Sequence, residues 1–275
     1  MSRETYSHIG KIKISAKEQD DIKKLVKKQI SIHRFFSLND IDITELGKCN
    51  PELSKTALHN AVYRLCLCDS YDKYGNIVTL KGTVLNASMI MEDYCRNRDK
   101  CTLNELIAFE KELCGASHRW LPMNTAYSVM VRVQENLFIS EKDVNFDIEK
   151  IDKAIELFCV GDYIPLKMIT SFSAFPYAGY QWNLFLLESF VRRFSRKFRF
   201  EVLAVNSKNA GAIVRKTRIL NYHQIMANAL AQSGIVLLEN TTLIFLFEKG
   251  YIGRRSLAGI AGLIEEARKI RAGGR

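Results

Sequence analysis

Apolar and polar positions near the start of the chain predict five elements in a fixed order. Apolar residues three and four apart indicate amphipathic helices, and short β-branched or aromatic runs beside turn residues indicate strands. By these rules the elements are a basic amphipathic helix over residues 16–32, a strand over 34–38, a short helix over 43–46, a long helix over 54–67, and a hairpin of strands 67–70 and 77–80 around a turn at 74–76.

The same order of elements recurs along the chain. The second round is predicted as helices over 87–96, from residue 102, and over 124–134, followed by a hairpin of 137–140 and 144–146. The third is predicted as helix 148–158, strand 163–166, short helix 167–172, helix 182–194 and a hairpin of 198–205 and 212–214. A fourth, partial round starts at residue 222 and closes on a helix over 257–270 without a full hairpin.

One leucine marks the step from strand to helix in each round. These leucines are Leu38, Leu103, Leu166 and Leu237, at intervals of 65, 63 and 71 residues. Spacing of this kind is typical of tandem supersecondary units. We call the units modules and place them at residues 1–83, 84–147, 148–219 and 220–275.

Helix, strand, helix, helix and hairpin is the order of elements in winged helix-turn-helix domains, and the chain resembles a tandem array of them. The resemblance rests on element order and period. It implies a mainly α (α+β) fold of three to four small winged-helix units with short two-stranded wings. Proteins of this superfamily act in transcriptional control and replication initiation, and others dock partner proteins, so the resemblance implies either role.

Composition adds an expectation about location and partner. No apolar run in the 275 residues approaches the roughly 18 that a bilayer span requires. The first residues lack the apolar core of a signal peptide, so we expect a cytoplasmic protein with no membrane partner. Seven cysteines, an odd number, predict thiols rather than a disulfide framework. The formal net charge of +10 favours a polyanionic partner, most often nucleic acid.

The long helix over 54–67 is the first candidate site. Its apolar side is formed by Leu58, Val62, Leu65 and Cys66. Its polar side carries Lys55, Thr56, His59, Asn60 and Tyr63. Side chains of these types can reach base edges in a major groove, although a helix that faces only solvent shows the same pattern.

A basic run is the second candidate site. It consists of Arg192, Arg193, Arg196, Lys197 and Arg199, and Lys208, Arg215, Lys216 and Arg218 extend it. With Phe194 and Phe198 directed into the core, we expect these cations to be exposed together and to contact backbone phosphates. The alternative is a solvated charge run without a ligand.

Two further clusters invite a functional interpretation, and we expect neither to have one. Cys95, Cys101, Cys114 and His118 have a spacing seen in some zinc sites. A helix between Cys101 and Cys114, at about 1.5 Å per residue, would hold those thiols apart, so we expect no metal. The aromatic residues Phe172, Phe175, Tyr177, Tyr180 and Trp182 are expected to close a core rather than to stack on bases.

No nucleotide-binding loop and no catalytic grouping is present in the sequence, so we expect a non-enzymatic protein without a cofactor. The first hypothesis is a duplex DNA-binding protein in which the basic run holds phosphates and the helix over 54–67 adds sequence preference. The alternative is a protein-interaction scaffold, an accessory subunit of a larger nucleic-acid-processing complex, with protein partners or further copies of itself. The acidic stretch at residues 141–143, expected in the second wing, favours this alternative because it would repel phosphates.

Overall fold

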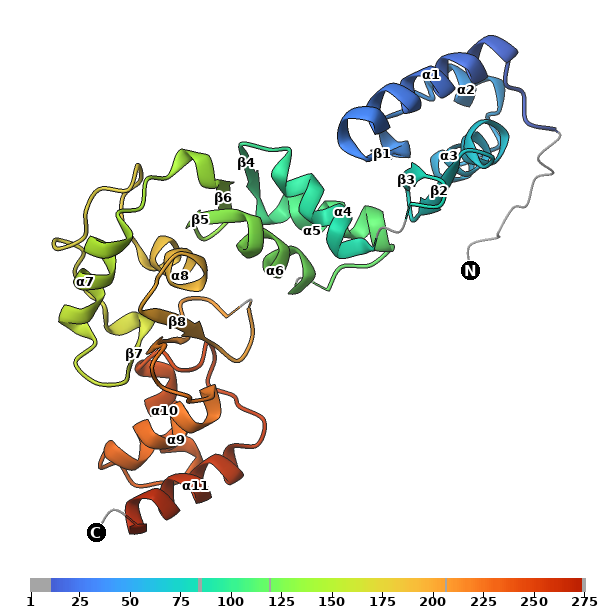
Figure 1. Ribbon diagram of the computed structural model, residues 1–275. Helices are drawn as coiled ribbons and strands as arrows, with labels where there is room; N and C mark the ends of the chain where they lie inside the picture. Colours follow the sequence, from blue (N-terminus) through green and yellow to red (C-terminus); the bar gives the residue numbers. More distant parts are fainter. Residues whose placement is uncertain (1–10, 84–85, 119, 206, 274–275) are drawn as a thin grey trace. The chain divides into compact units, whose positions relative to one another are not determined.

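The computed structural model describes residues 11–83, 86–118, 120–205 and 207–273. Of these residues, 52% are helical and 13% lie in strands, so the fold is mixed α/β with helix in excess. The chain forms two compact units. The N-terminal unit comprises residues 1–97 and 105–118, and the C-terminal unit comprises residues 98–104 and 119–275. Figure 1 labels the elements along the chain.

The N-terminal unit contains the first sheet and the helices around it. Its elements are α1 (Ala16–His33), β1 (Phe35–Ser37), α2 (Thr44–Cys49), α3 (Lys55–Val62), β2 (Tyr71–Tyr74), β3 (Ile77–Leu80), α4 (Ala87–Arg96) and most of α5 (Leu103–Cys114). Leu38, Leu58, Val62 and Val78 meet Val26 of α1 in one buried core. Burial of each such side chain contributes about 1.5–3 kcal/mol to stability. The buried side chains of α3 hold that helix against the sheet.

Local sequence sets the limits of these helices. Ser15 and Glu18 form a capping box at the start of α1, and Arg34 ends that helix in the left-handed region at φ 63°. The Ser54 hydroxyl accepts from the backbone N–H of Ala57 at 3.2 Å and so caps α3. The helix then continues as a π-helical turn, Tyr63–Leu67.

The first hairpin differs from the prediction. A strand over 67–70 is wrong, because the helix extends to Leu67 and the strand is Tyr71–Tyr74. The turn after it docks on the end of α5: Asn76 N–H donates to the Glu112 carbonyl oxygen at 3.1 Å. Gly75 has φ 59°, and a Cβ there would collide with the carbonyl oxygens of Glu112 and Leu113. The tip of this hairpin is therefore held by the protein itself.

The C-terminal unit holds the other two sheets and a group of three helices. Its elements are β4 (Lys100–Thr102), α6 (Trp120–Val129), β5 (Met130–Gln134), β6 (Leu137–Ser140), α7 (Ile148–Phe158), β7 (Tyr163–Pro165), α8 (Leu184–Arg193), β8 (Phe198–Glu201), β9 (Ala212–Arg215), α9 (Tyr222–Gln232), α10 (Glu239–Glu248) and α11 (Ile260–Gly273). The last three helices lie together at the orange-to-red end of the chain (Figure 1).

Three predictions in this unit are wrong. A helix over 124–134 ends at Val129, and Met130–Gln134 is instead the strand that pairs with Leu137–Ser140. Residues 144–146 form no strand, because 141–143 are a 3-10 turn rather than a hairpin loop. Met130–Val133 are buried side by side, as expected for a short strand covered on both faces. The short helix over 167–172 shrinks to one 3-10 turn, Leu166–Met168.

Three small antiparallel sheets of equal strand order recur along the chain: β1-β3-β2, β4-β6-β5 and β7-β9-β8. The aligned leucines occupy the same place in each. Leu38 N–H donates to Asn76 O at 2.8 Å, Leu103 N–H to Asn136 O at 3.3 Å and Leu166 N–H to Gly211 O at 2.9 Å. Each bond extends the ladder between the first and last strands of its sheet by one step. No helix among the described residues has the length and apolarity needed to cross a bilayer.

Candidate nucleic-acid interface

Helix α3 exposes a polar stripe, but with different members from those predicted. Lys55, Thr56 and Asn60 are exposed. Arg64, one turn beyond Asn60, is exposed as well and extends the same stripe. Thr56, Asn60 and Arg64 are spaced four residues apart, which places them along one side of the helix. This spacing was present in the sequence and predicts Arg64 as a member of the site.

Two predicted contacts, His59 and Tyr63, are structural instead. His59 is 1% exposed, because it lies beside Leu58 on the packed side of α3, so its predicted exposure is wrong. Burial, and then the positive charges of Lys55 and Lys73, lower the pKa of its imidazole. The half-buried Tyr63 donates its hydroxyl to the backbone oxygen of Tyr71 at 3.0 Å, which ties α3 to β2.

Lys73 on β2 joins the stripe from outside the helix. Its ammonium group donates to Asn60 Oδ1 and lies 5.8 Å from the centroid of the Tyr63 ring. Burial, and then the neighbouring Arg64 charge, lower the pKa of Lys73. We name Lys55, Thr56, Asn60, Arg64 and Lys73 the α3 surface. Within the described part of the chain, none of its three cations forms an ion pair.

The basic run is organised differently. Its arginines were expected to be exposed together, but the side chains of Arg192, Arg193 and Arg199 are only 18%, 22% and 27% exposed, so that expectation is wrong. Phe198 is fully buried, as predicted, and Phe194 is half-buried. The strand that follows α8 folds back against the core, and its neighbours supply carboxylates and carbonyl oxygens to the arginines.

Arg192 belongs to a buried network. Its Nε donates to Glu188 Oε1 at 2.9 Å, and Glu188 is 1% exposed. Its guanidinium carbon lies 4.5 Å from the centroid of the Tyr127 ring, and Tyr127 in turn accepts a hydrogen bond from Arg132 at 2.9 Å. Burial raises the pKa of the Glu188 carboxyl, and the nearby guanidinium groups oppose that shift. These contacts join α6, β5 and α8.

The other cations of the run also have partners within the protein. Arg193 pairs with Glu141, Lys197 with Glu156 at 3.0 Å, and Arg199 with Glu201 at 2.8 Å. Arg199 Nη2 donates in addition to the Leu220 carbonyl oxygen at 2.6 Å. Arg196 is the exception, because its side chain is exposed and has no partner among the described residues.

The cations that extend the run also have partners within the protein. Lys208 pairs with Glu135 at 2.8 Å and Arg218 with Asp162 at 2.8 Å. Arg215 donates to the Cys159 carbonyl oxygen at 2.6 Å, and Lys216 donates to the Ser195 carbonyl oxygen at 2.7 Å. The structure thus brings the predicted cations together on one region and neutralises most of them there.

Helices α6 and α8 stand where α3 stands in the order of elements, yet neither exposes a comparable face. In α6, six of ten residues are buried, and in α8 six consecutive residues from Leu186 to Val191 are buried. Packing on several sides removes the space that a groove-binding helix needs. Only α3 of these three helices has one packed side and one polar, exposed side.

The remaining candidates form no site. Within the described residues, no three His, Cys, Asp or Glu side chains are grouped so that they could hold a metal ion. Cys95 and Cys101 are buried while Cys114 is exposed. Phe172, Phe175 and Trp182 pack in the core of the third module, which confirms the core interpretation for these three, whereas Tyr177 is exposed.

Comparison with known proteins gave no match: no family model, no curated protein and no solved structure matches this chain. The class of protein is therefore set by its own geometry. That geometry consists of three small antiparallel sheets of one strand order and, on α3, an exposed stripe of cations and hydrogen-bonding side chains.

Proposed function

We propose that this is a non-enzymatic, tandem winged-helix protein that binds duplex DNA through the α3 surface. The order of elements and the common strand order of the three sheets support the winged-helix assignment. One observation carries the proposed function: Lys55 and Arg64 on an exposed helical face and Lys73 on the neighbouring strand form no ion pair with any described residue. Such a surface attracts a polyanion.

The side chains on this surface divide into two roles. Lys55, Arg64 and Lys73 contact backbone phosphates, which carry no base identity. Thr56 and Asn60 lie between them and face base edges, where an amide side chain pairs best with adenine. Lys73 holds the Asn60 amide oxygen and thereby orients that side chain before binding. Less rotamer freedom is then lost on binding.

The basic run has a different role in this proposal. Arg192, Arg193 and Arg199 hold α8 and β8 in place. We assign the phosphate contacts that were expected from them to the α3 surface instead. The seven cysteines are all free thiols, which supports a reducing, cytoplasmic location. The proposed activity involves no chemical step and no cofactor.

The test is a salt titration of binding to a fluorescently labelled random duplex, measured by anisotropy. Each phosphate contact contributes a slope of about −0.9 to a plot of log affinity against log salt concentration. The variant Lys55→Gln/Arg64→Gln/Lys73→Gln should therefore flatten the slope by roughly 2 to 3 units. A matched control is Lys17→Gln/Lys27→Gln/Lys28→Gln, which removes the same charge from exposed positions on α1. An equal loss in both variants, or in neither, would rule out the α3 surface as the contact.

A further inference from the structure

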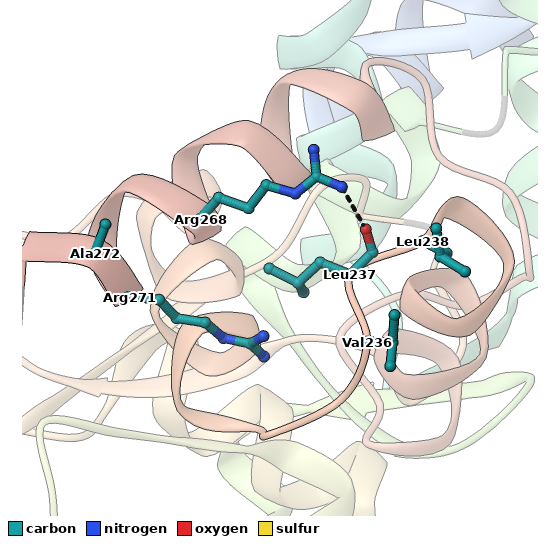
Figure 2. Close-up of a pocket in the computed structure, with 6 residues that line it drawn as sticks. All are labelled: Val236, Leu237, Leu238, Arg268, Arg271 and Ala272. Atoms are coloured by element: carbon teal, nitrogen blue, oxygen red, sulfur yellow. Dashed lines mark hydrogen bonds between the residues drawn. The ribbon is translucent and has the colours of Figure 1, made fainter.

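Several arginines of the C-terminal unit donate to backbone oxygens within it. Arg268 and Arg271 line a cavity of about 720 Å³ beside residues 236–238 (Figure 2). Arg268 Nη2 donates to the Leu237 carbonyl oxygen at 2.9 Å, as Figure 2 shows. Arg271 donates to the Leu230 carbonyl oxygen at 2.8 Å. These bonds tie α11 to the segments before it, so both arginines contribute to the fold.

Lys167 and Arg255, in the same unit, are arranged differently, because they converge on one aromatic ring. The ammonium nitrogen of Lys167 lies 5.1 Å from the centroid of the Phe247 ring, and the guanidinium carbon of Arg255 lies 5.3 Å from it. Neither cation has an ion pair or a hydrogen-bond acceptor among the described residues. The ring thus holds two positive charges together while their N–H donors have no partner in that part of the chain.

Tight turns fix the backbone that carries these two cations. Lys167 is the central residue of the 3-10 turn Leu166–Met168. Arg255 is the central residue of a three-residue turn, in which the Ser256 N–H donates to the Arg254 carbonyl oxygen at 2.8 Å. Less backbone freedom is therefore lost when a ligand binds to both side chains.

A glycine makes room for the side chain of Lys167. Gly250, which follows α10, has φ 84°, and a Cβ on it would lie 2.8 Å from Cδ and 2.9 Å from Cβ of Lys167. The Lys167 side chain therefore crosses a position that any other residue type would fill. The Gly250 carbonyl oxygen accepts from the Gly211 N–H at 3.0 Å, which attaches this loop to the third hairpin. The packing of the third module on the fourth thus sets the position of Lys167 beside Phe247.

The chain around these two cations is poor in acidic residues. Residues 163–187 and 249–264 contain no Asp or Glu. Glu248, which precedes the second stretch, is exposed and forms no ion pair among the described residues. Two like charges held against one ring repel each other, and a polyanion that approaches both relieves that repulsion. Phosphate oxygens suit both groups, because they accept from a guanidinium fork and from an ammonium group alike.

We propose that Lys167 and Arg255 contact the phosphate backbone of duplex DNA, as a second contact made by the C-terminal unit. The inference rests on the proposed DNA binding for the source of the phosphate, and on the geometry around Phe247 for the site. Lys167 donates from its ammonium group and Arg255 from its guanidinium group. Because backbone phosphates carry no base identity, this contact adds affinity for all sequences alike.

The salt dependence of binding to a random duplex measures this contact. Lys167→Gln/Arg255→Gln should flatten the plot of log affinity against log salt concentration by roughly 1 to 2 units. The matched control, Lys153→Gln/Lys269→Gln, removes two exposed charges from α7 and α11 of the same unit and should leave the slope unchanged. An unchanged slope in the first variant, or an equal change in both, would overturn the proposal.

A further variant keeps both charges and removes the ring. Phe247→Leu retains an apolar side chain at this half-buried position, but the two cations lose the ring that holds them together. In a variant whose circular dichroism matches the parent, the affinity for the duplex should fall about two- to fivefold. An affinity equal to that of the parent would overturn the assignment of the site to this ring.

The same titrations in the triple glutamine variant of the α3 surface separate this inference from the proposed function. Further flattening by Lys167→Gln/Arg255→Gln in that background supports the second contact, whether or not the α3 surface binds DNA. Flattening by the α3 variant alone would overturn the second contact and leave the proposed function standing. In the full ¹⁵N-labelled chain, amide shifts at Gly250 and Arg255 with inorganic phosphate but not with duplex would overturn the DNA contact and assign the site to free phosphate.

Discussion

The α3 surface and the basic run are both rich in cations, yet the fold treats them in opposite ways. In the basic run, Arg192, Arg193 and Lys197 meet Glu188, Glu141 and Glu156. On the α3 surface, the charge of Arg64 lowers the pKa of Lys73, and neither cation forms an ion pair among the described residues. Charge density along the sequence therefore does not measure the charge that a surface presents. The net charge of a surface depends on where the carboxylates of other elements lie in the folded protein.

Packing separates the two regions as well. Helix α3 is buried along one side and leaves a polar stripe outside, whereas α8 is buried through six consecutive residues. The arginines that end α8 are consequently drawn into contacts with neighbouring elements. A cation that stabilises the fold has little freedom left to bind a ligand, and a cation free to bind contributes little to stability.

The largest expected effect comes from the buried network. Arg192→Ala leaves Glu188 buried without its partner, and breaking such a pair costs about 3–5 kcal/mol of unfolding free energy. Arg64→Ala on the α3 surface should cost no more than about 0.5 kcal/mol, because its side chain is exposed and unpaired. Urea denaturation followed by circular dichroism measures both changes.

Arg196→Ala is the matched control within the run itself, since Arg196 is exposed and has no partner among the described residues. Like Arg64→Ala, it should lower the free energy of unfolding by no more than about 0.5 kcal/mol. If Arg192→Ala were as stable as Arg196→Ala, the division between structural and free cations would be wrong.

Much of this fold was predictable from the sequence, and the failures have identifiable causes. The apolar spacing predicts α1, α4 and α7 nearly to the residue because each has one clear apolar stripe. It fails at Met130–Gln134, where Val131 and Val133 can continue a helical stripe as well as form a strand. Only the pairing with β6, a contact across the sheet, decides between the two.

The second prediction compares how two residues of the α3 surface affect the preference for particular DNA sequences. Asn60→Ala should remove discrimination at one base pair, worth about 1–3 kcal/mol, while leaving the salt dependence of binding unchanged. Arg64→Gln should do the reverse and weaken binding to all sequences alike. Competition with a randomised duplex library, sequenced before and after selection, separates the two. A base preference retained in Asn60→Ala would remove this residue from the readout.

The third prediction concerns pH and a smaller effect. His59 has a lowered pKa in the folded state, while an unfolded chain has a histidine pKa of about 6.5. The unfolded state therefore binds more protons just below pH 6.5, so stability should fall as pH is lowered through that value. The urea midpoint of the parent should drop between pH 7.5 and pH 5.5, and His59→Gln should lose that part of the drop. The same drop in the variant would show that other groups cause it.

The candidate site was harder to predict than the fold. Thr56, Asn60 and Arg64 are recognisable from their spacing of four, but the burial of His59 depends on how far α3 rotates toward the sheet. Lys73 enters from a strand whose position was mispredicted by a few residues. The partners of the basic run are distant in sequence: Arg193 bonds to Glu141, 52 residues away, and to Met130, 63 residues away, so no local pattern reveals them.

The most direct test of the central claim compares two double variants on one duplex DNA. Arg64→Gln/Lys73→Gln removes two charges from the α3 surface, and Arg196→Gln/Lys216→Gln removes two charges from exposed residues of the basic run and its extension, neither of which forms an ion pair among the described residues. Anisotropy titrations at several salt concentrations should show a slope flatter by roughly 2 units for the first variant and an unchanged slope for the second. The opposite result would contradict the account and return the DNA contact to the basic run.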